Sequence, residues 1–216
     1  MAHKRVIILF AKNDNGMTSP FQKLTDFAFV WQYKNSIVGS FDGIPLVSTN
    51  QKVGDYVRVI SSSLELIRER DPRRYARVKA QTCWIVDWPH PSGAGSGLYQ
   101  HRIKATQIDF EFRPKAGDEL FHAAYYAKVI VHEATHGMIR DRGISTTPEN
   151  RIQVERICRA EENRFLESLM RFFPQLPARL IRPFDPEDWR ESWETGRIAR
   201  AVKALKRGNT KNELQT

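Results

Sequence analysis

The spacing of apolar residues along the chain predicts several helices. Between residue 54 and Arg70, apolar residues recur as on one face of a helix: Tyr56, Val59, Ile60, Leu64 and Ile67. Asp71-Pro72 interrupts this pattern, and a shorter basic helix is expected over residues 73–79. Further helices are expected over residues 118–142, from residue 147 to about 173, and from residue 185 onward.

Turn residues mark the ends of two of these predicted helices. Arg142-Gly143 is the basic residue and glycine typical of a helix C-terminus. Thr147 and Pro148 supply an N-cap and a first helical position for the helix that follows.

Short β-branched and aromatic runs predict strands. Residues 82–88 form one such run, residues 6–11 form another, and residues 98–112 include apolar residues that alternate with acidic ones. Residues 17–50 mix aromatic residues with turn residues and show no sustained helical period, which favours short strands or a loop-rich layer. The expected fold class is α+β, with a small twisted mixed or antiparallel sheet packed against helices.

One globular domain with three parts is expected. Residues 1–53 would form an N-terminal strand and loop-rich segment, residues 54–180 the core, and residues 181–216 a basic helix with a frayed tail. A chain of 216 residues that is 41% hydrophobic can bury a core without disulfide bonds. Its two cysteines form no Cys-x-x-Cys pair, so we expect a reducing, cytoplasmic setting.

The net charge of +9 permits an acidic partner such as nucleic acid or an anionic surface. The basic residues of the C-terminal helix, interleaved with Trp189 and Trp193, could form a docking surface, or simply the solvated face of a helix packed by its tryptophans. The apolar run at residues 6–11 is too short for a secretory signal or a membrane span, so no transmembrane segment is expected.

The predicted helix over residues 118–142 carries the elements of a zinc site. His132 and His136 lie four positions apart, on one face of a helix, so both can direct ring nitrogens at one metal ion. Glu133 is rotated by about 100° from His132. It can therefore stand beside the metal, where a carboxylate takes a proton from a bound water molecule. This His-Glu-x-x-His pattern predicts a zinc-dependent hydrolase with Glu133 as general base.

A catalytic zinc usually takes three protein ligands, so the fold must supply another. The next predicted helix places Glu155 and Glu162 on the face that should be buried, where a carboxylate needs a cation or good donors. We expect Glu155 to be the ligand, with Glu162 as the alternative ligand or as a group that orients an imidazole. In the competing interpretation both acids form ordinary salt bridges with Arg151 and Arg159. Cys158, on the same face, is expected to be a small core residue.

The stretch Val-His-Glu-Ala-Thr-His-Gly, together with residues 151–158, resembles the gluzincin branch of the zinc metallopeptidases in a compact bacterial form. The resemblance covers residues 129–165, and the preceding strands fit the three-stranded sheet of small gluzincins. It implies a zincin-like fold in which the two histidines and Glu155 bind Zn²⁺, Glu133 is the general base, and peptides or proteins are hydrolysed. Many relatives carry an acid four residues after the ligand glutamate, where this chain has Arg159.

Two further residues and two further functions stay open. Tyr99 and His101 lie on a predicted strand before the motif and could stabilise an oxyanion, or could be ordinary strand side chains. The alternative to an enzyme is a zincin-like module that binds zinc structurally and docks nucleic acid or a protein partner through its basic surface. A third interpretation has no metal and makes both histidines polar residues of the core.

Overall fold

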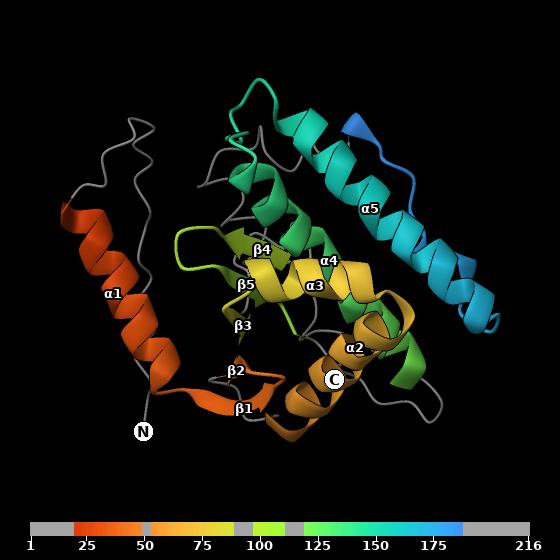
Figure 1. The fold of residues 1–216 in the computed structure, drawn as a ribbon, viewed down its shortest axis with the longest axis horizontal. Helices are drawn as coiled ribbons and strands as arrows, with labels where there is room; N and C mark the ends of the chain where they lie inside the picture. Colours follow the sequence, from red (N-terminus) through yellow and green to blue (C-terminus); the bar gives the residue numbers. More distant parts are fainter. Residues whose placement is uncertain (1–19, 49–52, 89–96, 111–118, 188–216) are drawn as a thin grey trace, which may run out of the picture.

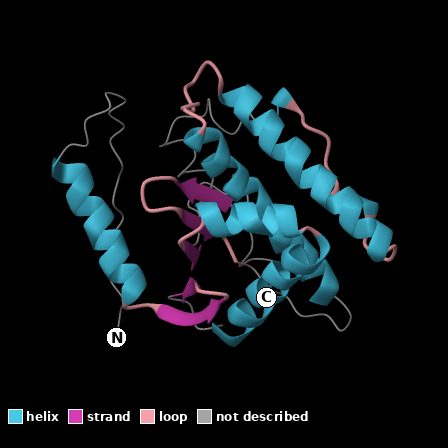
Figure 2. Ribbon diagram, in the orientation of Figure 1, coloured by secondary structure: helices cyan, strands magenta, loops and turns pink. Residues whose placement is uncertain are grey.

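The computed structural model describes residues 20–48, 53–88, 97–110 and 119–187, and these form an α+β fold around a mixed sheet (Figures 1 and 2). The five strands of the sheet lie in the order β1-β2-β3-β5-β4. β2, β3 and β5 run parallel, and the two outer strands are antiparallel to their neighbours. The strands are β1 (Ile37–Phe41), β2 (Ile44–Ser48), β3 (Trp84–Asp87), β4 (Gly97–Gln100) and β5 (Ala105–Ile108).

Helices cover both faces of this sheet. The helices of the described residues are α1 (Pro20–Lys34), α2 (Val53–Arg70), α3 (Pro72–Gln81), α4 (Glu119–Asp141) and α5 (Arg151–Phe172), followed by the short 3₁₀ turn η1 (Ala178–Leu180). Adjacent residues of a strand point to opposite faces. One face packs against α2 and α4 through Leu46, Ile85 and Ile108, and the other packs against Phe29 and Tyr33 of α1. α5 lies along α4, on the side away from α1 (Figure 1).

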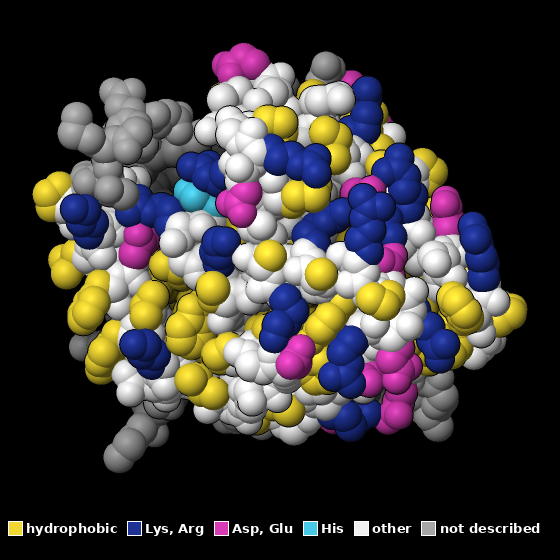
Figure 3. All heavy atoms as spheres, in the orientation of Figure 1, with side chains coloured by type: hydrophobic (Ala, Val, Ile, Leu, Met, Phe, Trp, Pro, Cys, Tyr) yellow, Lys and Arg dark blue, Asp and Glu magenta, His cyan; other side chains and the backbone are white. Residues whose placement is uncertain are grey.

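The helix α1 corrects the sequence prediction of short strands or a loop-rich layer at residues 17–50. Residues 20–34 are helical, and only the part from residue 37 onward forms short strands. The helical period is obscured because α1 is apolar on two sides. Phe29 and Tyr33 are buried against the sheet, whereas large apolar side chains on the outer side are 59–68% exposed: Phe21, Leu24, Phe27 and Trp31. Figure 3 shows hydrophobic side chains along this edge of the molecule.

Most other predicted elements of the described residues are confirmed. α2, α3 and β3 match their predicted ranges closely, and Asp71 caps α3 by accepting a hydrogen bond from the backbone N–H of Arg74 at 2.9 Å. α4 ends at Asp141, and Gly143 follows with a φ of +82°, the left-handed conformation typical of a helix C-terminus. The β1–β2 hairpin turns at Asp42-Gly43, both with positive φ, as in a two-residue hairpin turn.

Three features of the fold differ from the sequence predictions. α5 begins at Arg151, later than predicted, because Thr147 and Asn150 first form a turn in which each backbone N–H donates to the other's side-chain oxygen. Residues 98–112 contain two strands, β4 and β5, separated by a turn. The sheet has five strands, more than the three expected, and it draws strands from both sides of residue 53.

Parts of the sequence analysis fall on residues that the structure does not describe. The strand predicted at residues 6–11 lies outside the described ranges, as do Trp189, Trp193 and the basic residues of the predicted C-terminal helix. Among the described helices, none combines the length and the apolar character needed to cross a membrane.

Candidate metal centre

α4 carries the His-Glu-x-x-His motif through the interior of the molecule. The helix is enclosed by α2, α3, the sheet and α5, so most of its residues are buried, including His132 and Glu133. α5 packs against α4 and turns two buried carboxylates, Glu155 and Glu162, toward His132. The motif and both candidate acids of the following helix therefore meet at one helix–helix contact.

Three potential ligand atoms meet between the two helices. His132 Nε2 lies 3.3 Å from His136 Nε2 and 3.3 Å from Glu155 Oε2, and His136 Nε2 lies 3.4 Å from the same Glu155 oxygen. In a tetrahedral zinc site with metal–ligand distances of about 2.0–2.1 Å, neighbouring ligand atoms are about 3.3–3.4 Å apart. The three atoms therefore form a triangle of the size that suits one zinc ion.

The Glu155 oxygen in this triangle is buried and makes no hydrogen bond with any described residue. Burial acts to raise the pKa of Glu155, but His132 and His136 outweigh it and lower that pKa to about 2. Burial acts to lower the pKa of His132, but Glu155 and Glu162 outweigh it and raise that pKa to about 10. The cluster thus favours positive charge at its centre, which either a proton or a metal cation can supply.

Glu162 lies on the other side of the His132 ring. Its Oε2 is 3.1 Å from His132 Nδ1, while its Oε1 accepts a hydrogen bond from Arg159 at 2.7 Å and lies 3.1 Å from Lys128 Nζ. A carboxylate at Nδ1 fixes the orientation of an imidazole and leaves Nε2 for a metal. In this structure Glu162 is thus placed to orient the ring, and Arg159 forms the predicted salt bridge with Glu162.

Glu133 is 5% exposed, and burial raises its pKa. Its carboxylate lies against Gly97, the first residue of β4. A Cβ atom added to Gly97 would come within 2.6 Å of Glu133 Oε1 and 2.8 Å of Val129 Cγ1. The lack of a side chain at Gly97 therefore lets β4 approach α4 closely enough to enclose the candidate general base. The sequence pattern did not indicate this role of Gly97.

Cys158 is a fourth candidate ligand residue beside this triangle. One ligand atom each from His132, His136 and Cys158 lies within 4.8 Å of the others, so this group could hold a metal ion. Cys158 is fully buried in a small apolar cluster with Ile139 and Val154, and burial raises the pKa of its thiol. The sequence analysis treated Cys158 as a core residue only, and its proximity to both histidines was missed.

Tyr99 and His101 lie near α4 but are not aimed at the triangle by any contact of the described residues. The Tyr99 hydroxyl donates to the backbone carbonyl of Gln81 at 2.8 Å and lies against Gly137, where an added Cβ would be 2.6 Å from the hydroxyl oxygen. His101 is exposed in the turn after β4, and partial loss of water together with the charges of Arg140 and Arg102 lowers its pKa. Their role as oxyanion stabilisers stays a prediction.

Arg77 of α3 forms hydrogen bonds with both helices of the site, α4 and α5. Arg77 donates to the hydroxyl of Thr135, within the motif, at 3.2 Å and to Glu161 of α5 at 2.9 Å. Arg74 also lies 3.3 Å from Glu161. Through Arg77, Glu161 of α5 and Thr135 of α4 are both linked to α3.

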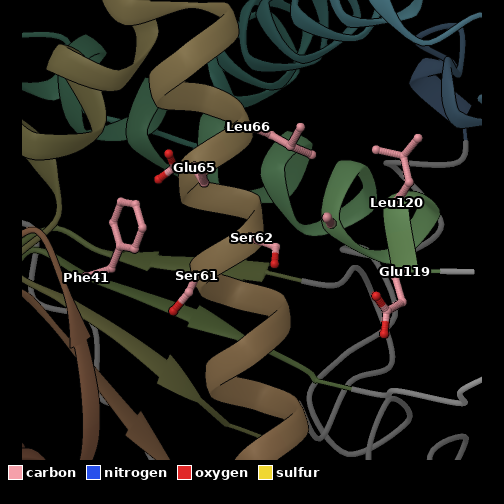
Figure 4. Close-up of a pocket in the computed structure, with 8 residues that line it drawn as sticks. Phe41, Ser61, Ser62, Glu65, Leu66, Glu119 and Leu120 are labelled. Carbon is pink, nitrogen blue, oxygen red and sulfur yellow. The ribbon is translucent and has the colours of Figure 1, made fainter.

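A shallow depression of about 480 Å³ lies elsewhere, between α2 and the first turn of α4. Figure 4 shows Ser61, Glu65 and Leu66 of α2 on one side of it and Glu119 and Leu120 on the other. Ala123 is the lining residue of α4 nearest to His132 in sequence, nine residues before it, or about 14 Å at the helical rise. The depression is therefore separate from the candidate metal centre.

The chain was compared with protein-family models, curated proteins and solved structures, and none of them matches it. The chemistry of the site is therefore argued from its own residues.

Proposed function

We propose that this protein is a zinc-dependent hydrolase, with peptide-bond hydrolysis as its reaction, and that it follows the gluzincin arrangement to which its motif is similar. His132, His136 and Glu155 would hold the zinc ion. The observation that carries this proposal is the triangle of their ligand atoms, with sides of 3.3, 3.3 and 3.4 Å. The buried Glu155 oxygen without a hydrogen-bond partner among the described residues supports the same assignment.

The chain's own residues would perform distinct tasks in this reaction. Zinc bound at the triangle would lower the pKa of a water molecule and polarise the substrate carbonyl. Glu133 would accept the proton of that water and pass it to the leaving amine, a task suited to a buried carboxylate whose pKa is raised by burial. Glu162 holds the His132 ring by its Nδ1 atom. His136, with 17% of its side chain exposed, is the most accessible of the three ligand residues.

Metal content and turnover test this proposal separately. Untagged protein should contain one zinc ion per chain by elemental analysis, and it should cleave a quenched fluorescent peptide library. Glu133→Gln should keep the zinc and lose turnover, because the amide cannot accept the proton. Glu69→Gln, at an exposed position of α2, is the matched control and should behave as wild type. Zinc-free wild type, or a Glu133→Gln variant that still cleaves peptides, would refute the proposal.

A second candidate function is a structural zinc site, and the position of Cys158 favours it. If Cys158 joined the two histidines and Glu155, four protein ligands would close the coordination sphere, as in structural zinc sites. Substitution with cobalt distinguishes the two functions, because a thiolate ligand gives an intense sulfur-to-cobalt charge-transfer band. The hydrolase predicts no such band, and the structural site predicts a band that Cys158→Ser removes. We favour the hydrolase because the atoms of His132, His136 and Glu155 lie 3.3–3.4 Å apart, the spacing of zinc ligands. The ligand atom of Cys158 is placed only within 4.8 Å of those of the two histidines.

A further inference from the structure

We propose that Lys128 is a positioning residue of the metal centre, which acts on His132 through Glu162. This inference rests on the proposed function, since it concerns the same site. The sequence analysis did not consider Lys128, which is a buried lysine in an otherwise apolar part of α4.

Lys128 lies one helical turn before His132, on the same side of α4. Its ammonium group is held at three points. Nζ lies 3.1 Å from Glu162 Oε1, donates to the backbone carbonyl of Leu180 at 3.2 Å, and lies 5.1 Å from the centre of the Tyr125 ring. With its side chain 6% exposed, Lys128 is a fixed cation and not a solvated surface charge.

The two oxygens of Glu162 have partners on both α4 and α5. Oε2 contacts His132 Nδ1, and Oε1 contacts both Arg159 and Lys128. Arg159 lies on α5, three residues before Glu162, so its bond leaves the position of α5 relative to α4 free. Lys128 lies on α4 itself. Its contact with Glu162 therefore sets the carboxylate against the helix that carries both histidines.

The sign of the effect on zinc affinity separates positioning from direct charge. A cation near a zinc site repels the metal, so removing it would tighten zinc binding if Lys128 acted only through its charge. If Lys128 positions Glu162, its removal lets the carboxylate turn away and frees the His132 ring. Loss of such outer-shell support weakens metal binding by about 10–100-fold.

The test measures the zinc dissociation constant of the full chain by competition with a chelator. Lys128→Met should raise it by about 10–100-fold, and Lys79→Met, which removes a surface lysine paired with Asp42, should leave it unchanged. Because Lys128 acts through Glu162, adding Lys128→Met to a Glu162→Met variant should change it no further. An unchanged or tighter constant in Lys128→Met, or an equal loss in both backgrounds, would overturn the inference. If Lys128→Met does not fold, Lys128→Gln keeps a donor for the Leu180 carbonyl and takes its place.

Nuclear magnetic resonance of the metal-free protein distinguishes a failure of this inference from a failure of the proposed function. In wild type, the proton on His132 Nδ1 should exchange slowly with water, because Nδ1 lies 3.1 Å from Glu162 Oε2, which can accept a hydrogen bond from it. In Lys128→Met that proton should exchange rapidly, whereas Lys79→Met should match wild type. Failure of wild type to bind zinc would refute the proposed function alone, and an unaltered Nδ1 proton in Lys128→Met would refute the role of Lys128.

Discussion

Replacing Gly97 by alanine tests how tightly β4 encloses the candidate general base. The new Cβ would lie 2.6 Å from Glu133 Oε1 and 2.8 Å from Val129 Cγ1, where ordinary contact begins at 3.4 Å. Either β4 and α4 must separate or the Glu133 carboxylate must turn away. Separation is overpacking, which costs about 1–3 kcal/mol of the free energy of unfolding. Rotation of Glu133 would cost less stability but would misplace the base, and a misplacement of about 1 Å can lower turnover by about 100-fold.

Gly54→Ala is the matched control for this change. Gly54 is the second residue of α2 and has no atom within 4 Å of an added Cβ, so alanine there should raise the free energy of unfolding by about 0.4–1 kcal/mol. Urea unfolding, zinc content and peptide turnover should be measured for both variants. Gly97→Ala should keep its zinc, because the proposed ligands come from α4 and α5 only. A Gly97→Ala variant with the stability and turnover of wild type would show that β4 does not confine Glu133.

Three further predictions concern the residues around the triangle. Glu155→Ala should abolish stoichiometric zinc in elemental analysis while Glu162→Ala only weakens binding, and the reverse order would contradict the ligand assignment. Because the pKa of His132 is raised from 6.5 to about 10 without metal, its stabilising effect is complete below pH 6.5 and is lost as the pH rises toward 10. Urea unfolding in the presence of a chelator should therefore show lower stability at pH 9.5 than at pH 6.5, and a His132→Gln variant should show a smaller difference. Arg77→Met removes the donor shared by Thr135 and Glu161, and we expect a loss of about 1–3 kcal/mol in unfolding experiments; an unchanged stability would mean that Arg74 suffices.

The parts of the fold that the sequence predicted best are those with one apolar face. α2 has that pattern, and its predicted range agrees with the structure within one residue at each end. α1 does not, because apolar side chains cover its outer side as well as its buried side, and a periodicity argument cannot see which side the sheet will occupy. The start of α5 was missed because the bonds between Thr147 and Asn150 hold a turn where helical signals alone indicate a helix.

The residues of the candidate site were likewise predicted only where the spacing within one helix was informative. The spacing within two helices was enough to bring His132, His136, Glu155 and Glu162 together, since each helix repeats its faces regularly. The contributions of Gly97 and Lys128 depend on contacts between elements. Gly97 lies where the strand β4 meets α4, and Lys128 of α4 contacts the turn η1. Such contacts follow from the tertiary packing, and no periodicity in a single element records them.

The candidate metal ligands and the candidate general base depend on different parts of the fold. All the proposed ligands, and the groups that orient them, belong to one continuous pair of helices joined by a short connection, α4 and α5. Contacts between residues close in sequence form with little loss of chain entropy. The wall beside Glu133, by contrast, is a strand that precedes both helices and is held by the sheet. Under the proposed function, metal binding and catalysis would therefore depend on different parts of the fold, and a substitution that disturbs the sheet would leave a chain that binds its ion but no longer turns over substrate.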